Sequence, residues 1–172
     1  EEDKKRFRVV TSPEVHRRSL KIGLALRKLI SDGGFGAFSM NFLEFNGKYG
    51  VDTLPFFEAS KGMARGIGYG GEGDVLTASL VGTLQRAFGK TTFTEVFCAD
   101  WKGGSIFLSH MGEINPEVAE GKALLVEKPF LFKGTKNPAI LTCSLRKGKA
   151  VFVNLSPCPD NTFRLIAAPV EV

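Results

Sequence analysis

Apolar residues recur at helical spacing along residues 13–32, and the flanking residues carry the signals of a helix start and stop. Thr11 is the expected cap, and Pro13 is an early proline whose missing N–H costs nothing at this position. Glu14 stands three residues after Thr11, as in a capping box. The glycine pair at residues 33–34 supplies the stop, so the pattern predicts a helix over residues 13–32.

Two more helices and one strand are predicted before residue 90. Asp74 is the expected N-cap of a helix over residues 75–89. Pro55 opens a shorter helix over residues 56–65, and the apolar run at residues 35–42 predicts a short buried strand. This part of the chain therefore has an α/β pattern.

From Thr91 onward the pattern changes to short β-rich runs. Six such runs are separated by glycine, lysine and proline turns with almost no intervening helix: TTFTEVFCAD, SIFLSHMG, ALLVEKPFLF, AILTCSL, AVFVNLS and FRLIAAPVEV. This spacing is typical of an antiparallel meander or a small closed barrel. We therefore expect an α+β chain in which an α/β segment, residues 1–90, is followed by an antiparallel β barrel, residues 91–172.

The composition is that of an ordinary globular protein, with 43% hydrophobic and 24% charged residues. No apolar run approaches the roughly 18 residues of a membrane span, and the N-terminus has no apolar core like that of a secretory signal. The three cysteines are widely spaced, which indicates neither a disulfide framework nor a zinc motif. We expect a soluble, cytoplasmic protein, and the missing initiator Met suggests a piece of a longer one.

The net charge of +5 includes a basic cluster within the first 21 residues. Such clusters are usually solvated helix faces, so this one permits nucleic-acid binding without arguing for it. A basic β-barrel domain that binds nucleic acid is kept as an alternative, although nucleic acid is not the expected partner. His16, which lies in this basic helix, is expected at the surface.

The stretch GIGYGGEGDV contains Gly66, Gly68 and Gly71 in the G-x-G-x-x-G spacing of a dinucleotide-binding loop. That motif must follow a strand, whereas the preceding residues 56–65 look helical, and Glu72 would repel a pyrophosphate. Instead, Glu72 stands just before a helix N-terminus, where negative charge is favoured and glycine backbone can approach a ligand closely. The loop is better interpreted as presenting an acid.

A second acid is placed by hairpin geometry. If the turn between the first two β runs is centred between Lys102 and Gly103, Glu95 lies directly opposite His110 on an otherwise apolar face. A buried carboxylate needs a partner or a metal, so the pair is either a metal site or a structural Glu-His pair. A slip in register, which would expose both side chains, is the third possibility.

Glu72, Glu95 and His110 together would form a mixed nitrogen and oxygen site. Such a site suits Mn²⁺, Mg²⁺ or Co²⁺ better than a structural zinc. The same carboxylates could also move protons, because a metal and partial burial tune the pKa of Glu towards neutrality.

Four stretches, in their order and spacing, resemble the central to C-terminal part of the L-arabinose isomerase family, which is related in fold to L-fucose isomerase: GGFGAFSMNF, GYGGEGDVLTASL, TTFTEVF and LSHMGEINPEVA. The resemblance covers most of the chain, and its most specific parts are G-x-G-E-G-D and S-H-M-x-E-x-x-P. It implies that residues 1–90 are the C-terminal part of an α/β central domain and that residues 91–172 are the β-barrel C-terminal domain.

The resemblance also implies an activity, aldose-ketose isomerisation of a pentose or hexose through an enediol. The catalytic residues that the resemblance implies are Glu72 and Glu95. The implied cofactor is a divalent metal, most often Mn²⁺, with Glu72, Glu95 and His110 as its ligands. The implied assembly is a homo-oligomer. The chain departs from the family in lacking a second ligand histidine downstream of His110 and an N-terminal α/β domain, and in having Val75 where an aromatic residue is common. A non-catalytic sugar-binding or regulatory module of the same fold is therefore a further alternative.

Overall fold

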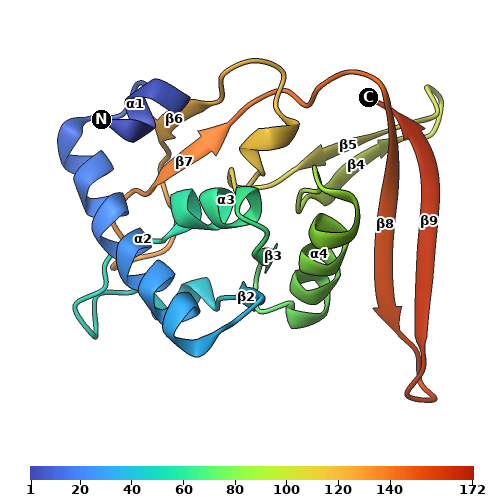
Figure 1. The fold of residues 1–172 in the computed structure, drawn as a ribbon, viewed down its shortest axis with the longest axis horizontal. Coiled ribbons are helices and arrows are strands. Elements are labelled where there is room, and N and C mark those ends of the chain that lie inside the picture. Colours follow the sequence, from blue (N-terminus) through green and yellow to red (C-terminus); the bar gives the residue numbers. More distant parts are fainter.

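Helix α3 (Phe56–Ala64) lies in the middle of the molecule, with α2 (Pro13–Gly33) on one side and α4 (Val75–Phe88) on the other (Figure 1). The computed structural model describes residues 1–172. A long hairpin, β8 (Lys149–Pro157) with β9 (Phe163–Glu171), forms the edge opposite α2. The chain begins with a short helix, α1 (Glu2–Arg6), and contains two 3-10 turns, Phe42–Glu44 and Pro116–Val118.

The strands form small sheets, so the fold is mixed α+β. In the largest sheet, β1 (Arg8–Val9) runs parallel to β6 (Leu124–Glu127), which pairs antiparallel with β7 (Ala139–Thr142). The other pairs are parallel β2 (Ala37–Ser39) with β3 (Gly68–Gly70), and the antiparallel hairpins β4 (Glu95–Asp100) with β5 (Ser105–Ser109) and β8 with β9.

Each of the six predicted β runs contains a strand, and each predicted helix is present, but β1 and β3 were not predicted. Closure of the C-terminal strands into a barrel stays a prediction, as does the division into two domains near residue 90. Strand β1 nevertheless pairs with β6, so the largest sheet joins segments from both sides of that position. None of the helices combines the length and apolar character needed to cross a bilayer.

The helix ends follow from local side-chain chemistry. The cap of α2 is Ser12 rather than Thr11, because the Ser12 hydroxyl accepts the hydrogen bond from the backbone N–H of Val15. Gly34 closes the same helix in the left-handed conformation that the stop requires. For α4 the prediction is confirmed: Asp74 Oδ1 accepts from the backbone N–H of Thr77 at 2.8 Å, and Gly89 ends the helix.

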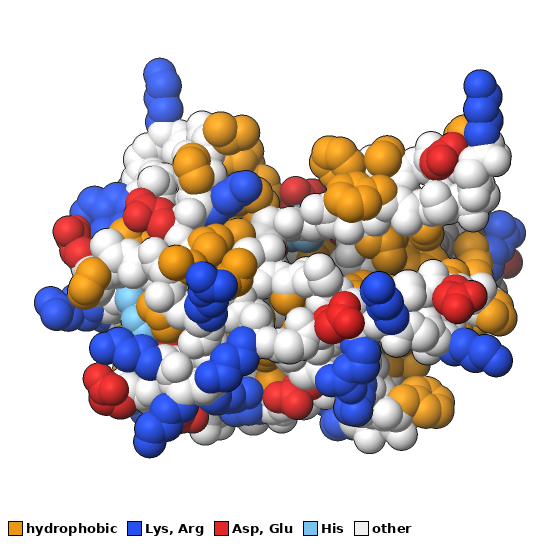
Figure 2. Space-filling view, turned by 90° about the horizontal axis from the view of Figure 1, so that it is seen from above, with side chains coloured by type: hydrophobic (Ala, Val, Ile, Leu, Met, Phe, Trp, Pro, Cys, Tyr) orange, Lys and Arg blue, Asp and Glu red, His pale blue; other side chains and the backbone are white.

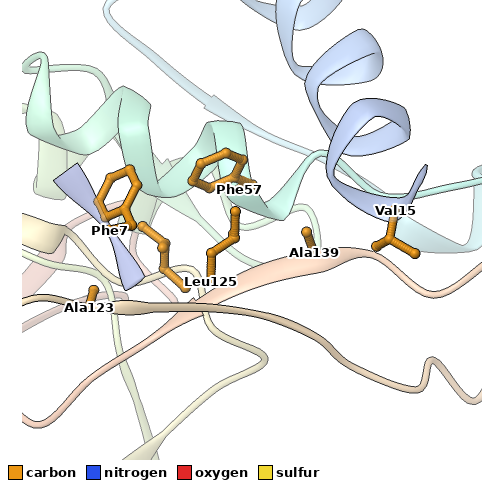
Figure 3. Close-up of a cluster of buried hydrophobic side chains, with 7 residues drawn as sticks. Phe7, Val15, Phe57, Ala123, Leu125 and Ala139 are labelled. Carbon is orange, nitrogen blue, oxygen red and sulfur yellow. The ribbon is translucent and has the colours of Figure 1, made fainter. Parts of the chain in front are cut away.

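A hydrophobic cluster ties the N-terminal segment to the sheet formed by β1, β6 and β7 (Figure 3). Phe57 projects from α3 towards Leu125 on β6, and Phe7 packs edge-on against Phe57 with ring centroids 5.7 Å apart. A second cluster, which includes Met63, Tyr69 and Phe93, joins α3 to β3 and α4. Helix α3 thus contributes to both clusters and forms the centre of the fold.

Because α3 is central, its charged residues are buried and need partners. Glu58, whose side chain is 2% exposed, accepts two hydrogen bonds from the Arg27 guanidinium, at 2.9 and 3.1 Å, and also contacts Arg65. Lys61 Nζ lies 3.8 Å from Glu58 and 3.4 Å from Asp3 of α1. Burial lowers the pKa of Lys61 below its ordinary value despite these two carboxylates.

The expectation that His16 lies at the surface is wrong. Its side chain is 13% exposed, and its Nε2 is 2.9 Å from Asp3 Oδ2. The reason is that α1, which was not predicted, packs its Asp3 between α2 and α3 and covers the imidazole.

Replacement of Glu58 by Ala is expected to lower the free energy of unfolding by about 3 kcal/mol, because it removes one of the two carboxylates beside the buried Lys61 ammonium and leaves only Asp3. This is the low end of the range for breaking a buried pair, since Arg27 and Arg65 keep access to solvent. Urea unfolding measures the change. The control is Glu14→Gln, a solvent-exposed partner of Arg18 that should cost under about 0.5 kcal/mol; equal losses in the two variants would contradict the prediction.

Candidate functional site

The segment before the glycine motif is helical, as predicted, because α3 ends at Ala64. Strand β3 lies within the motif itself, and the loop after it leads into α4. The motif glycines, however, serve packing. A side chain at Gly68 would lie 2.5 Å from the backbone nitrogen of Gly82 on α4, and one at Gly71 would lie 3.3 Å from the His110 imidazole. Two of the three glycines of the dinucleotide spacing are thus explained by close contacts within the fold.

Glu72 occupies the tip of this loop with a positive φ of 57°, a left-handed conformation that non-glycine residues rarely adopt. Gly73 follows with a φ of 87° and allows the chain to turn into α4. The Glu72 side chain is exposed and lines a cavity together with His110. Backbone strain of this kind is common at functional sites, where the surrounding structure holds it in place.

The β4–β5 hairpin has the predicted register near its turn but not at its open end. Cys98 pairs with Phe107 and Asp100 with Ser105, as a turn centred between residues 102 and 103 requires. A β-bulge between Val96 and Cys98 then shifts the pairing by one residue, so that Glu95 lies opposite Ser109 and not opposite His110. The prediction of direct pairing is therefore wrong by one position.

Glu95 and His110 are nevertheless neighbours, with Glu95 Oε1 3.8 Å from His110 Nε2. The Glu95 side chain is 45% exposed, whereas that of His110 is 17% exposed. The carboxylate thus faces solvent beside a largely buried imidazole.

Two buried residues that were not predicted as site residues, Tyr69 and Glu113, complete the site. The Tyr69 hydroxyl donates a hydrogen bond to Glu113 Oε1 at 2.7 Å, and Glu113 Oε2 lies 2.5 Å from His110 Nδ1. Both residues are 1% exposed. The available signal was the spacing in Ser-His-Met-Gly-Glu, which places a second carboxylate three residues after His110.

The charges around His110 act on its pKa in opposite directions. Burial lowers the pKa of the imidazole, but the hydrogen bond to Glu113 and the negative charges of Glu113, Glu95 and Glu72 together raise it above its ordinary value. Burial, followed by the charge of Glu113, raises the pKa of Tyr69 far above its ordinary value, so Tyr69 remains a donor at all physiological pH values. Three carboxylates therefore influence one imidazole.

His110 lies between two hollows. A small cavity of about 80 Å³ is lined by Tyr69, Glu72, His110 and Glu113 on its polar side and by six apolar side chains: Met40, Phe42, Phe56, Met111, Phe130 and Phe132. A larger open groove of about 1300 Å³ runs between the β4–β5 hairpin, β7 and the ends of the β8–β9 hairpin, and His110 and Glu113 line it too. In Figure 2 hydrophobic side chains are exposed on both sides of a notch in the surface.

Two models of protein families match the chain, and together they account for nearly all of it. Residues 5–89 match the L-arabinose isomerase central domain, and residues 90–172 match the L-arabinose isomerase C-terminal domain. The chain belongs to the L-arabinose isomerase family. It combines a segment of the family's central domain with a segment of its C-terminal domain.

Curated L-arabinose isomerases from several bacteria are similar to this chain. The one from Nocardioides sp. is 34% identical over 162 residues, which are 91% of this chain and 32% of the relative. Those from Leuconostoc mesenteroides and Flavobacterium johnsoniae are 35% and 36% identical, over 86% and 88% of the chain and 31% and 30% of the relatives. The chain thus spans about a third of the length of the L-arabinose isomerases it matches.

The donor atoms of this chain fit a divalent cation in their chemistry. Carboxylate oxygens and one imidazole nitrogen suit Mn²⁺ or Mg²⁺, and Nδ1 of His110 is engaged by Glu113, which leaves Nε2 facing Glu95. Two ligands bound at about 2.0 to 2.2 Å from one ion can be separated by the 3.8 Å seen between Glu95 and His110. Glu72 lines the same cavity as His110, but no three His, Cys, Asp or Glu side chains are gathered in a metal-binding arrangement.

Proposed function

We propose that this chain is part of a metal-dependent aldose-ketose isomerase that acts on a pentose or hexose through an enediol. One observation carries the proposal: two exposed carboxylates, Glu72 and Glu95, stand beside His110, whose other ring nitrogen is engaged by a buried acid. Membership of the L-arabinose isomerase family supports the same reaction class.

The proposed reaction moves one proton between adjacent carbons and one between adjacent oxygens. One of Glu72 and Glu95 accepts the proton from C2 of the aldose and returns it to C1, while the other transfers the proton between O2 and O1. Both carboxylates are exposed, so a sugar can approach them, and the cavity beside Glu72 is lined mainly by apolar side chains. Glu72 also stands two residues before Asp74, the N-cap of α4, at an end of the helix where negative charge is favoured.

The proposed cofactor is a divalent cation, with Mn²⁺ as the first choice. Glu72, Glu95 and His110 would hold it, and when bound it supplies Lewis-acid polarisation of the sugar oxygens. The residues themselves remain responsible for orienting the sugar and moving its protons.

Three further expectations belong to the same proposal: closure of the C-terminal strands into a barrel, a homo-oligomer, and a cytoplasmic location. Large hydrophobic side chains exposed on the β4–β5 and β8–β9 hairpins support burial of these hairpins in a larger assembly, because a two-stranded hairpin is marginally stable alone. Phe97, Phe107, Leu165 and Ile166 are examples.

The proposal is tested by incubating the longer protein that contains this chain with aldopentoses and aldohexoses in D₂O containing Mn²⁺. We expect ketose formation with deuterium from solvent at C1 of the product, detected by NMR, because a carboxylate that carries the transferred proton exchanges it with solvent. Sugar binding without any ketose would support the non-catalytic sugar-binding alternative. Ketose that forms without any solvent deuterium would contradict an exposed carboxylate as the carrier of the proton between C2 and C1.

A further inference from the structure

A continuous chain of hydrogen-bonding groups runs from the core to the candidate site. It starts at the Tyr69 hydroxyl on β3, passes through both carboxylate oxygens of Glu113, and reaches Nδ1 of His110. Nε2 of His110 then faces Glu95. Glu113 uses each oxygen for one neighbour, which is how a buried carboxylate avoids the cost of desolvation.

The chain of hydrogen bonds determines which imidazole nitrogen carries a proton. An ionised carboxylate can only accept hydrogen bonds, so Nδ1 of His110 must donate to Glu113. In the neutral imidazole this leaves the lone pair on Nε2, the atom that faces Glu95. The tautomer is thus fixed by a residue that contacts the ring nitrogen opposite to the one facing Glu95.

The ring is also held in position by packing. Phe93 contacts His110 edge-on, with centroids 5.1 Å apart, and contacts Tyr69 in the same way at 5.4 Å. The backbone at Gly71 approaches so closely that an added methyl group would lie 3.4 Å from Nε2. Because Gly71 directly precedes Glu72, the same contact places the loop acid relative to the imidazole.

We propose that Glu113 is a positioning residue that holds His110 as the Nδ1-protonated tautomer and directs the Nε2 lone pair to the side of Glu95. Tyr69 orients Glu113 and thereby links β3 and the loop after it to His110. The consequence for cation affinity and turnover rests on the proposed function, whereas the tautomer itself does not. Buried carboxylates that orient a ligating histidine typically contribute 10-fold to 100-fold in metal affinity or activity.

The first test measures the tautomer directly by ¹H–¹⁵N correlation NMR of the imidazoles. The chain has only two histidines, so a His16→Gln background leaves His110 as the single signal. At a pH where His110 is neutral we expect the proton on Nδ1, and we expect Glu113→Gln to yield a mixture of tautomers, because an amide can donate as well as accept. A proton on Nε2 in the protein that retains Glu113 would overturn the proposal. An unchanged tautomer in Glu113→Gln would overturn it too.

The second test measures the dissociation constant for Mn²⁺ in the longer protein, by calorimetry, together with kcat and KM. Glu113→Gln should weaken Mn²⁺ binding by about 10-fold to 100-fold. The matched control is Glu117→Gln, which removes an exposed carboxylate four residues away. It should leave the dissociation constant for Mn²⁺, kcat and KM unchanged. Unchanged Mn²⁺ affinity in a folded Glu113→Gln protein would contradict the positioning role.

Tyr69→Phe provides a milder variant in case Glu113→Gln does not fold. It removes one hydroxyl and keeps the ring between Phe38 and Phe93. We expect it to retain the Nδ1-protonated tautomer but to weaken Mn²⁺ binding by a smaller factor. If the tautomer results hold and the protein isomerises no sugar, the positioning of His110 stands and the proposed function is removed, so the two failures are distinguishable.

Discussion

Replacement of Glu95 by Gln in the longer protein is expected to lower kcat for ketose formation by about 10²-fold to 10⁴-fold. The amide keeps the size of the side chain but cannot accept and return a proton. We expect the same range for Glu72→Gln, because the proposed reaction needs two proton transfers. The effect should fall mainly on kcat, measured by steady-state kinetics with sugar and Mn²⁺ in excess.

The control for both variants is Glu120→Gln. Glu120 is an exposed carboxylate that lines the large groove together with His110 and makes no ion pair with that imidazole. It should keep near-normal kcat. Near-normal isomerisation by both Glu72→Gln and Glu95→Gln would remove these residues from the mechanism, whereas loss in only one of them would leave a single proton carrier.

Gly68→Ala is expected to lower the free energy of unfolding by about 3 kcal/mol, the upper part of the range for overpacking. The added methyl group would lie within 2.7 Å of two backbone atoms of Gly82 and would also overlap the carbonyl oxygen of Ala78. Backbone atoms in a helix cannot move aside as a flexible side chain can. To accept the methyl group, α4 would have to separate from β3, which would displace the loop that carries Glu72.

The matched control is Gly62→Ala in helix α3. An added methyl group there would have no neighbour closer than 3.8 Å, and alanine favours the helix, so we expect a gain of about 0.5 to 1 kcal/mol. Chemical denaturation of both variants provides the comparison. Equal stabilities of Gly68→Ala and the parent protein would show that β3 and α4 are not held as closely as described.

The parts of the fold that were predictable from sequence are those with local causes. The cap at Asp74 and the stops at Gly34 and Gly89 involve residues within one turn of each other, so the sequence pattern contains the whole interaction. Strand β1 could not be predicted in this way, because two residues show no periodicity and its partner β6 is distant in sequence. The burial of Glu58 likewise depends on Arg27 from another helix, and no local pattern indicates it.

In the candidate site, too, the features with local causes were predictable and those that depend on distant residues were not. The loop acid Glu72 and the proximity of Glu95 to His110 were predicted, since the hairpin register near the turn follows from turn position. The bulge at Phe97 was not predicted, because the alternation of apolar and polar residues does not show that β4 contains an extra residue there. The burial of Glu113 was also hidden, since its partner Tyr69 comes from a strand 44 residues earlier. The roles of these residues stay predictions.

The pairing of β1 with β6 has a consequence for how the protein is made. The side chain of Ser19 accepts a hydrogen bond from the backbone of Ala139, a residue 120 positions later, and the core around Phe57 needs Leu125 and Leu141. Contacts of such long range form slowly, and on the ribosome they have to wait for the later residues to emerge. The first half of the nascent chain therefore exposes Phe7, Val15 and Phe57 until β6 and β7 arrive, which is the interval in which a chaperone would bind.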